Sequence, residues 1–317
     1  MFYKFLSILL LVSSLSAAKI NEPTISMQTS GFVVDLVADK GKLYCATDAS
    51  SVDIFDIETK ELIEIIKVEQ ITDFMGDVID SKIYSVDVMG DTVMILSQAE
   101  KGARRVHIYK DKKLQLIIPY TDELFIAKAK FLDKDTLLLG LLSNELISYD
   151  LKKRKQNYKI QVSQSKFSDF VLIDEKTRVV VADESGNLKI HNTKDGSFSK
   201  MLGGQNLDNV FQVDSKKGII ATAGQDRKTV VYNLNNGSNF YKTAEFLIYS
   251  VAISPSAKLV AYSNDEQGNV EIFKVSTHSA IGHFGGNKGT ISKILFLNEK
   301  EFFIASDSTT LNYYKIN

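Results

Sequence analysis

The stretch TAGQDRKTVVYNLNNGS (residues 222–238) contains the pattern that decides the fold. Small residues lead into a polar turn that holds Asp226, and the apolar strand that follows ends in the aromatic Tyr232. Asparagine and glycine then mark a second turn. The stretch therefore predicts a hairpin of two short strands, and the next question is whether this unit recurs.

Short apolar strands that end in an aromatic residue or a histidine recur along the chain, with successive spacings of 54, 40, 42, 41, 41 and 41 residues. Each period also supplies further strands of alternating apolar residues separated by turns, as in residues 248–284. Four short strands at this period predict an all-β fold, a seven-bladed β-propeller over residues 19–317. The seven repeat positions are Phe55, Tyr109, Tyr149, His191, Tyr232, Phe273 and Tyr314.

The two ends of the chain predict how the ring closes. The seventh repeat stops three residues after Tyr314, so it supplies three strands and lacks a fourth. Residues 24–28 (TISMQ) precede the first repeat and place Ile25 and Met27 on one face of a strand. We expect this N-terminal strand to complete the last blade, because such pairing removes the exposed edges of an open arc.

The repeat resembles the WD40 repeat. An aspartate stands in the turn before the third strand of five blades, and an aromatic-aspartate pair occurs at Phe55-Asp56 and Tyr149-Asp150. The chain contains no tryptophan and lacks the Gly-His start of that repeat, so the resemblance is partial and favours a WD40-like propeller. The turn aspartates are Asp48, Asp183, Asp226, Asp265 and Asp307.

Residues 1–18 are predicted to be a secretory signal peptide. Lys4 precedes the apolar run of residues 5–12, and SSLSAA then offers small residues for a cleavage site. A membrane anchor is less favoured, because the apolar run is shorter than the roughly 20 residues of a spanning helix. We therefore expect an exported, soluble mature chain with no membrane span.

Charge and cysteine content exclude other classes. Lys and Arg total 38 against 39 Asp and Glu, with no block of one sign, so we expect no nucleic-acid partner. Cys45 is the single cysteine and cannot pair within the chain. Its apolar neighbours predict a small buried side chain and not a reactive thiol.

One connection between repeats is longer than the others, namely EQITDFMGDVIDS (residues 69–81). In a propeller, blade-to-blade connections and the loops between second and third strands emerge on one face, here called the top face. The insertion places Phe74 and Met75 there, where they either contact a partner or cover the channel or a neighbouring blade. Lys166 and Arg227 lie in other top-face loops and are candidates for polar contacts with an acidic partner.

The sequence offers no motif for catalysis or cofactor binding. The four histidines have no ligand spacing, and Asp73, Asp77 and Asp80 do not follow the alternation of an EF-hand loop, so we expect no metal. No haem, phosphate-loop or nucleophile-elbow motif is present either, so we expect no cofactor and no enzyme activity. The alternative, a propeller enzyme or small-ligand protein, would need three or more ionisable groups converging at the channel mouth. The histidines are His107, His191, His278 and His283.

Seven stretches, in chain order behind the predicted signal peptide, resemble the L accessory proteins of periplasmic nitrate reductase systems (the NapL family). The resemblance implies a soluble periplasmic protein that supports the assembly, stability or electron supply of nitrate reductase, with subunits of that enzyme as partners. The family supplies no catalytic residues to assign. The stretches are DFMGDVIDSKIYSVDV, LLSNELISYD, IQVSQSKFSDF, VADESGNLKI, DNVFQVD, TAGQDR and FLIYSVAISPS.

Overall fold

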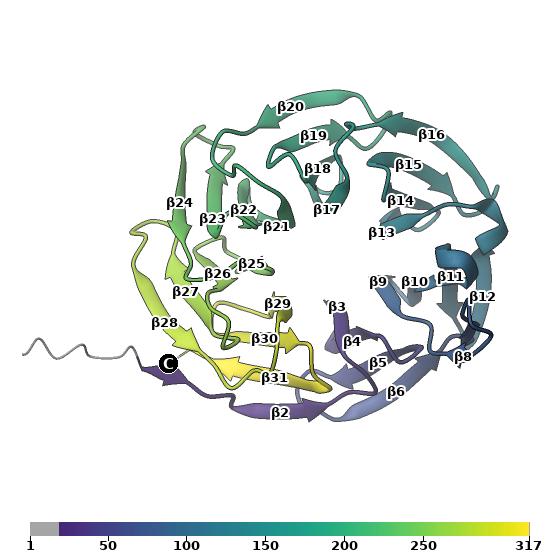
Figure 1. Cartoon of the computed structure of the whole chain (residues 1–317), viewed down its shortest axis with the longest axis horizontal. Helices are drawn as coiled ribbons and strands as arrows, with labels where there is room; N and C mark the ends of the chain where they lie inside the picture. The colour runs from purple at the N-terminus through teal and green to yellow at the C-terminus, as the bar shows by residue number, and fades with distance from the viewer. Residues whose placement is uncertain (1–18, 317) are drawn as a thin grey trace, which may run out of the picture.

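Seven sheets, each built on four antiparallel strands, form a closed ring in the computed structural model, which describes residues 19–316 (Figure 1). The predicted seven-bladed β-propeller is confirmed. The signal peptide predicted over residues 1–18 lies outside the described residues. In Figure 1 the innermost strand of every blade lines the centre of the ring, and the fourth strand lies at the rim.

The strands follow one another from the inside of each blade to the outside. Blades 1 to 4 are β3 (Val33–Asp39), β4 (Lys42–Thr47), β5 (Ser51–Asp56) and β6 (Leu62–Lys67); β9 (Ile83–Met89), β10 (Thr92–Gln98), β11 (Arg104–Lys110) and β12 (Lys113–Ile118); β13 (Ile126–Asp133), β14 (Thr136–Leu141), β15 (Glu145–Asp150) and β16 (Lys155–Gln161); β17 (Phe167–Ile173), β18 (Arg178–Asp183), β19 (Leu188–Asn192) and β20 (Phe198–Leu202). Blades 5 to 7 are β21 (Val210–Lys216), β22 (Ile219–Gly224), β23 (Lys228–Asn233) and β24 (Asn239–Thr243); β25 (Val251–Ile253), β26 (Leu259–Ser263), β27 (Val270–Lys274) and β28 (Ala280–Phe284); β29 (Ile291–Phe296), β30 (Glu301–Ser306), β31 (Thr310–Lys315) and the N-terminal β2 (Ile25–Gln28).

Position within the blade explains the sequence pattern of each strand. Second strands such as β22 are buried along their whole length, because neighbouring blades cover both faces of the sheet. They therefore read as continuous apolar runs. Outer strands such as β24 alternate between exposed and partly buried residues, because only one face meets the next blade.

The seven repeat positions all lie on third strands, opposite an apolar residue of the second strand, as in the pairs Leu43–Phe55 and Ile220–Tyr232. Six of the seven side chains are buried, and Tyr109 is partly buried with its hydroxyl donating to Glu64 of the preceding blade. These residues fill the space between blades, which explains why the spacing of one aromatic position revealed the whole ring.

The chain ends close the ring as expected. Residues of β2 pair antiparallel with β31, and the two strands run side by side at the rim of the last blade (Figure 1). Met27 is buried at 5% exposure, whereas Ile25 on the same face is 41% exposed. A second closure was not predicted: β1 (Ile20–Asn21) pairs parallel with β28 and makes blade 6 five-stranded.

Turn aspartates hold the top-face connections in place. Asp226 accepts hydrogen bonds from the Nδ2 atom of Asn206 at 3.1 Å and the amide of Leu207 at 2.9 Å, and Asn206 in turn accepts from Thr222 at 2.8 Å. In blade 4, Asp183 accepts from the Nδ2 atom of Asn144 at 2.9 Å in the same way. These bonds fix loops that would otherwise be held only at their two ends.

Carboxylates on the inner strands join neighbouring blades at four of the junctions in the described part of the ring. Asp35 accepts from the amide of Val86 at 3.2 Å, and Asp87 accepts from the amide of Phe131 at 2.8 Å. The same bond recurs further around the ring, from Val213 to Asp169 at 3.0 Å and from Ile253 to Asp214 at 2.8 Å. Buried and partly buried aspartates therefore link neighbouring blades at the centre of the propeller.

The closing strand gives a direct test of the ring. Met27→Ala should lower the free energy of unfolding by about 2 kcal/mol, because it removes a buried side chain between β2 and the core. Ile25→Ala, on the same strand but largely exposed, is the matched control and should cost less than about 1 kcal/mol. Deleting residues 24–28 should lower Tm further than either substitution. Equal melting of all three variants and the wild type in calorimetry would contradict closure by β2.

Candidate functional site

The insertion forms a small hairpin on the top face. Between β6 and β9 the chain uses fifteen residues (68–82) where other blade connections use five to seven, and it forms β7 (Ile71–Thr72) and β8 (Val78–Ile79). The loop between β10 and β11 is also lengthened and contains the short helix η1 (Glu100–Gly102). The long interval seen in the sequence therefore comes from two adjacent loops and not from one.

The tip of this hairpin presents two apolar side chains to solvent. Asp73 accepts from the amides of Met75 at 2.8 Å and Asp77 at 2.9 Å, which closes a tight turn around Phe74 and Met75. Phe74 is 95% exposed and Met75 is 72% exposed. At these exposures they neither plug the channel nor pack over a neighbouring blade, and their contact with a partner stays a prediction.

The base of the hairpin is fixed to blade 2. Ile71 is buried, and the buried guanidinium of Arg105 donates to the carbonyl of Glu69 and forms an ion pair with its carboxylate at 3.5 Å. Between the hairpin and η1 lies a groove of about 610 Å³, lined mostly by apolar atoms of Ile71, Phe74, Ile79 and Ala99. The hairpin is thus an anchored projection beside a mainly apolar groove.

Lys166 and Arg227 do not join this hairpin. Lys166 lies in the connection between blades 3 and 4, where its ammonium group is 4.0 Å from the Glu184 carboxylate. Arg227 is exposed in the second turn of blade 5, with a left-handed backbone at φ 62°. Both residues lie in top-face loops, but the structure spreads the four predicted contact residues over different blades. Any single partner that touches all of them must cover most of the top face.

The acidic residues of the insertion have internal partners. Asp73 closes the hairpin turn, and Asp80 accepts from Ser50 at 2.9 Å and Gln70 at 3.0 Å. Among residues 19–316, no group of three or more acidic, histidine or cysteine side chains is arranged to hold a metal ion. Cys45 is buried as predicted, and burial raises the pKa of its thiol.

The four histidines occupy separate places. His191 packs edge-on against Phe198 and shares a hydrogen bond with the carbonyl of Gly196 at 2.9 Å, while His107 is buried in β11. His283 lies on β28 beside β1. His278 stands in the last turn of blade 6 and stacks on Phe240 at 3.7 Å between ring centroids.

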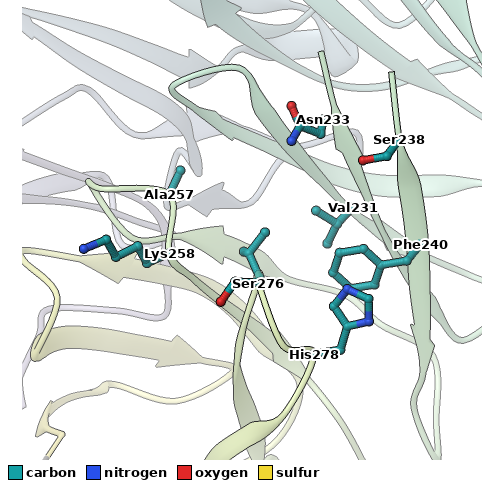
Figure 2. A pocket seen from close by; sticks show the side chains of 9 residues that line it. Val231, Asn233, Ser238, Phe240, Ala257, Lys258, Ser276 and His278 are labelled. Carbon is teal, nitrogen blue, oxygen red and sulfur yellow. The ribbon is translucent and has the colours of Figure 1, made fainter. Parts of the chain in front are cut away.

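Phe240 and His278 line a cavity of about 380 Å³ between blades 5 and 6. Figure 2 shows their rings face to face, with Asn233, Ser238 and Lys258 around the opening. The lining contains one imidazole and one ammonium group but no carboxylate. The cavity therefore offers no carboxylate for general acid–base chemistry.

The channel at the centre of the ring contains the ionisable cluster that sequence reasoning missed. Lys128 pairs with Asp169 at 2.6 Å, and Lys130 pairs with Asp35 at 3.0 Å, with Lys293 at 3.6 Å from the same carboxylate. All five side chains are at most about one-fifth exposed. Five ionisable groups thus converge in the channel, which is the feature named above as the mark of a ligand site.

A shared strand register gives this cluster its position. Six of the seven inner strands, all except β25, begin with an apolar residue and carry a polar residue two positions later. At that position four blades carry charge, as Asp35, Lys128, Asp169 and Lys293, and a register irregularity precedes each of them. Aligning the first strands of the blades at this position is the signal that would have found the cluster in the sequence.

Comparisons with known proteins give no family for the chain. No protein-family model matches it, and a search of curated proteins finds no match. The relation to nitrate reductase accessory proteins therefore stays a prediction. Within residues 19–316, no helix has the length and apolar content needed to cross a membrane.

Buried His107 predicts how stability depends on pH. Burial, with repulsion from Arg105, lowers the pKa of His107 to about 4 from its usual 6.5. Between these values the unfolded chain binds a proton that the folded chain does not. Stability should therefore fall as the pH drops from 6.5 towards 4, by at most about 1.4 kcal/mol per pH unit from this residue.

Urea unfolding at several pH values checks this expectation. His107→Leu should flatten the slope between pH 6.5 and 4.5, because it removes the group that takes up a proton only in the unfolded chain. A slope that is the same in the wild type and the His107 variant would contradict the assignment.

Proposed function

We propose that the protein is a non-catalytic binding module that docks a partner protein on its top face. The observation that supports this is the distribution of exposed apolar residues in the loops and turns. Within the described part of the chain, every large apolar side chain that is exposed outside the blade strands belongs to a top-face connection. These are Phe32, Phe74, Met75, Val78 in the hairpin, Tyr120, Phe125, Leu142 and Leu207.

Turns on the opposite face contribute no large exposed apolar side chain among residues 19–316. Apolar residues gathered on one side and absent from the other are typical of an interaction surface, because scattered exposure would be equal on both. The hairpin carries two of the most exposed apolar side chains of that surface. Burying Phe74 and Met75 would contribute about 1.5 to 3 kcal/mol each before the costs of association reduce it.

Basic residues lie beside the hairpin and further around the top face, whereas the hairpin itself carries the exposed acids Glu69, Asp77 and Asp80. Lys101 is exposed on η1 next to the hairpin, and Arg104 follows it with its guanidinium over the ring of Tyr84 at 4.0 Å. Lys166 and Arg227 add exposed positive charge over blades 4 and 5. We therefore expect carboxylates on the part of the partner that faces these basic residues, where they would act mainly on the rate and orientation of encounter.

The identity of the partner rests on the sequence resemblance. The resemblance to L accessory proteins and the predicted signal peptide support a soluble periplasmic protein that contacts subunits of periplasmic nitrate reductase. A docking module that carries no electrons can support such an enzyme during assembly or by stabilising it, and can aid electron supply only by holding other proteins in place.

Paired variants test the docking surface. Phe74→Ala with Met75→Ala should weaken binding of the periplasmic nitrate reductase complex at least tenfold, because it removes the two most exposed apolar side chains of the hairpin. Leu62→Ala with Ile63→Ala, on the outer strand of blade 1, is the matched control, since these residues are 46% and 49% exposed but lie outside the top face. Lys166→Glu with Arg227→Glu should slow association more than it speeds dissociation.

The measurement is capture of the complex from native periplasm with mass spectrometry, followed by kinetics on the purified components. Full binding by the hairpin variant, or equal loss in the Leu62 and Ile63 control, would contradict top-face docking. The hairpin variant could instead lose binding to proteins other than nitrate reductase subunits. That result would support docking on the top face and contradict nitrate reductase as the partner.

A further inference from the structure

Another cavity lies inside the ring. It is on the side of the central channel away from the top face. It has a volume of about 220 Å³ and is lined by inner strands of six blades, which surround the centre in Figure 1. Its wall combines charged side chains with aliphatic ones such as Leu36, Val171 and Ile294. Lys216, at the end of β21 and 44% exposed, lies on the side where the cavity meets solvent.

The ionisable groups of this cavity are unbalanced. Its lining contains two aspartates and four lysines, and a third aspartate, Asp169, pairs with Lys128 at 2.6 Å. Lys130 pairs with Asp35 and Lys216 with Asp214, so Lys293 is the lysine without a carboxylate of its own. One positive charge is therefore in excess in this cavity. Its charged residues are Asp35, Lys128, Lys130, Asp214, Lys216 and Lys293.

The two carboxylates are already occupied by the protein. Asp35 accepts from the amides of Leu36 at 3.0 Å and Val86 at 3.2 Å and from the ammonium group of Lys130 at 3.0 Å. Asp214 accepts from the amides of Ser215 and Ile253, both at 2.8 Å, and from the ammonium group of Lys216 at 3.4 Å. These carboxylates are used for hydrogen bonds within and between blades. Little of their hydrogen-bonding capacity is left for the lysines that face the cavity.

Lys293 and Lys128 keep unused donors. Among residues 19–316, the nearest recorded polar partner of the Lys293 ammonium group is Asp35 at 3.6 Å, which is beyond hydrogen-bond distance. Lys128 donates one hydrogen bond, to Asp169 at 2.6 Å, although an ammonium group has three donors. Both lysines line the cavity, and the side chain of Lys293 is 21% exposed and that of Lys128 is 15% exposed.

The pKa values of Lys128 and Lys293 are shifted by burial and by the charges around them. Burial lowers the pKa of Lys128, and repulsion from Lys293 and Lys130 adds to the effect against the attraction of Asp169. Burial also acts against the charged form of Lys293, but Asp35, Asp169 and Asp214 together raise its pKa. A bound anion would relieve the repulsion among the lysines and favour the charged form of each.

We propose that this cavity binds a small organic carboxylate, with Lys293 and Lys128 holding the carboxylate group and the aliphatic wall holding the remainder. The apolar wall disfavours a fully hydrated inorganic ion, because such an ion would lose its water without replacement on that side. An apolar cavity of about 150 Å³ takes up benzene, so 220 Å³ has room for a ligand of roughly eight or nine non-hydrogen atoms.

Titration calorimetry and thermal shift with succinate and benzoate test the proposal, with inorganic phosphate and chloride as comparisons. The purified wild-type protein should bind at least one of the two carboxylates with a Kd below about 1 mM, and its Tm should rise with ligand concentration. Phosphate and chloride should bind at least tenfold more weakly. Binding of neither carboxylate, or equal binding of the inorganic ions, would overturn the proposal.

Two pairs of variants locate the site. Lys293→Met should weaken binding at least tenfold, whereas Lys242→Met should not, although Lys242 is equally buried at 22% exposure and is also paired with a buried acid, Glu271. Should Lys293→Met fold poorly, Lys216→Glu at the cavity opening serves as the test, and its neighbour Lys217→Glu, outside the cavity lining, serves as control. Wild-type affinity in the folded cavity variants would place the ligand elsewhere and overturn the assignment.

The outcome does not depend on the docking surface. Phe74→Ala with Met75→Ala should bind the carboxylate as the wild type does, because the hairpin does not line the cavity. Loss of carboxylate binding in the hairpin variant would contradict a channel site, whatever that variant does to partner binding.

Discussion

Hydrogen bonds from the amides of one inner strand to the carboxylates of the preceding one hold the centre of this propeller together. Each joins two blades that are about forty to fifty residues apart in sequence, as from Val86 to Asp35 and from Val213 to Asp169. A hydrogen bond to a buried charged group contributes about 1.5 to 3 kcal/mol, and an unpaired buried carboxylate would cost more than that. The lysines of the channel, with these bonds, make such burial possible, so stability and channel chemistry depend on the same residues.

The repeat and the closing strand were predictable, because both follow from local patterns. Tyr149 and its six counterparts mark the third strand of each blade by spacing alone, and Met27 lies on a strand that only the last blade lacked. The parallel pairing of β1 with β28 was not predictable, since two residues carry no periodicity. The charged cluster was missed for a different reason: Asp35 and Lys293 lie at opposite ends of the chain, and only ring closure brings them together.

For the candidate contact residues, too, the local sequence predicted their exposure but not their distances from one another. An apolar pair in a long polar loop identified Phe74 and Met75, and both are exposed. Their separation from Lys166 and Arg227 depends on which blades carry each loop, and sequence spacing does not convert into distance around a ring. A partner that uses the hairpin as anchor therefore needs to reach only Lys101 and Arg104 nearby, and contacts to blades 4 and 5 require a broad, flat surface.

The difference between the two faces has a cause in backbone geometry. On the face opposite the top, several turns join adjacent antiparallel strands through two residues with positive φ, as at Lys40 and Gly41, Asp111 and Lys112, and Lys217 and Gly218. Such turns favour glycine and short or flexible polar residues and disfavour large branched ones. Top-face connections cross from an outer strand to the next inner one and carry no such demand on every residue. They are free to lengthen and to hold apolar side chains, so a partner surface can develop there without disturbing the sheets.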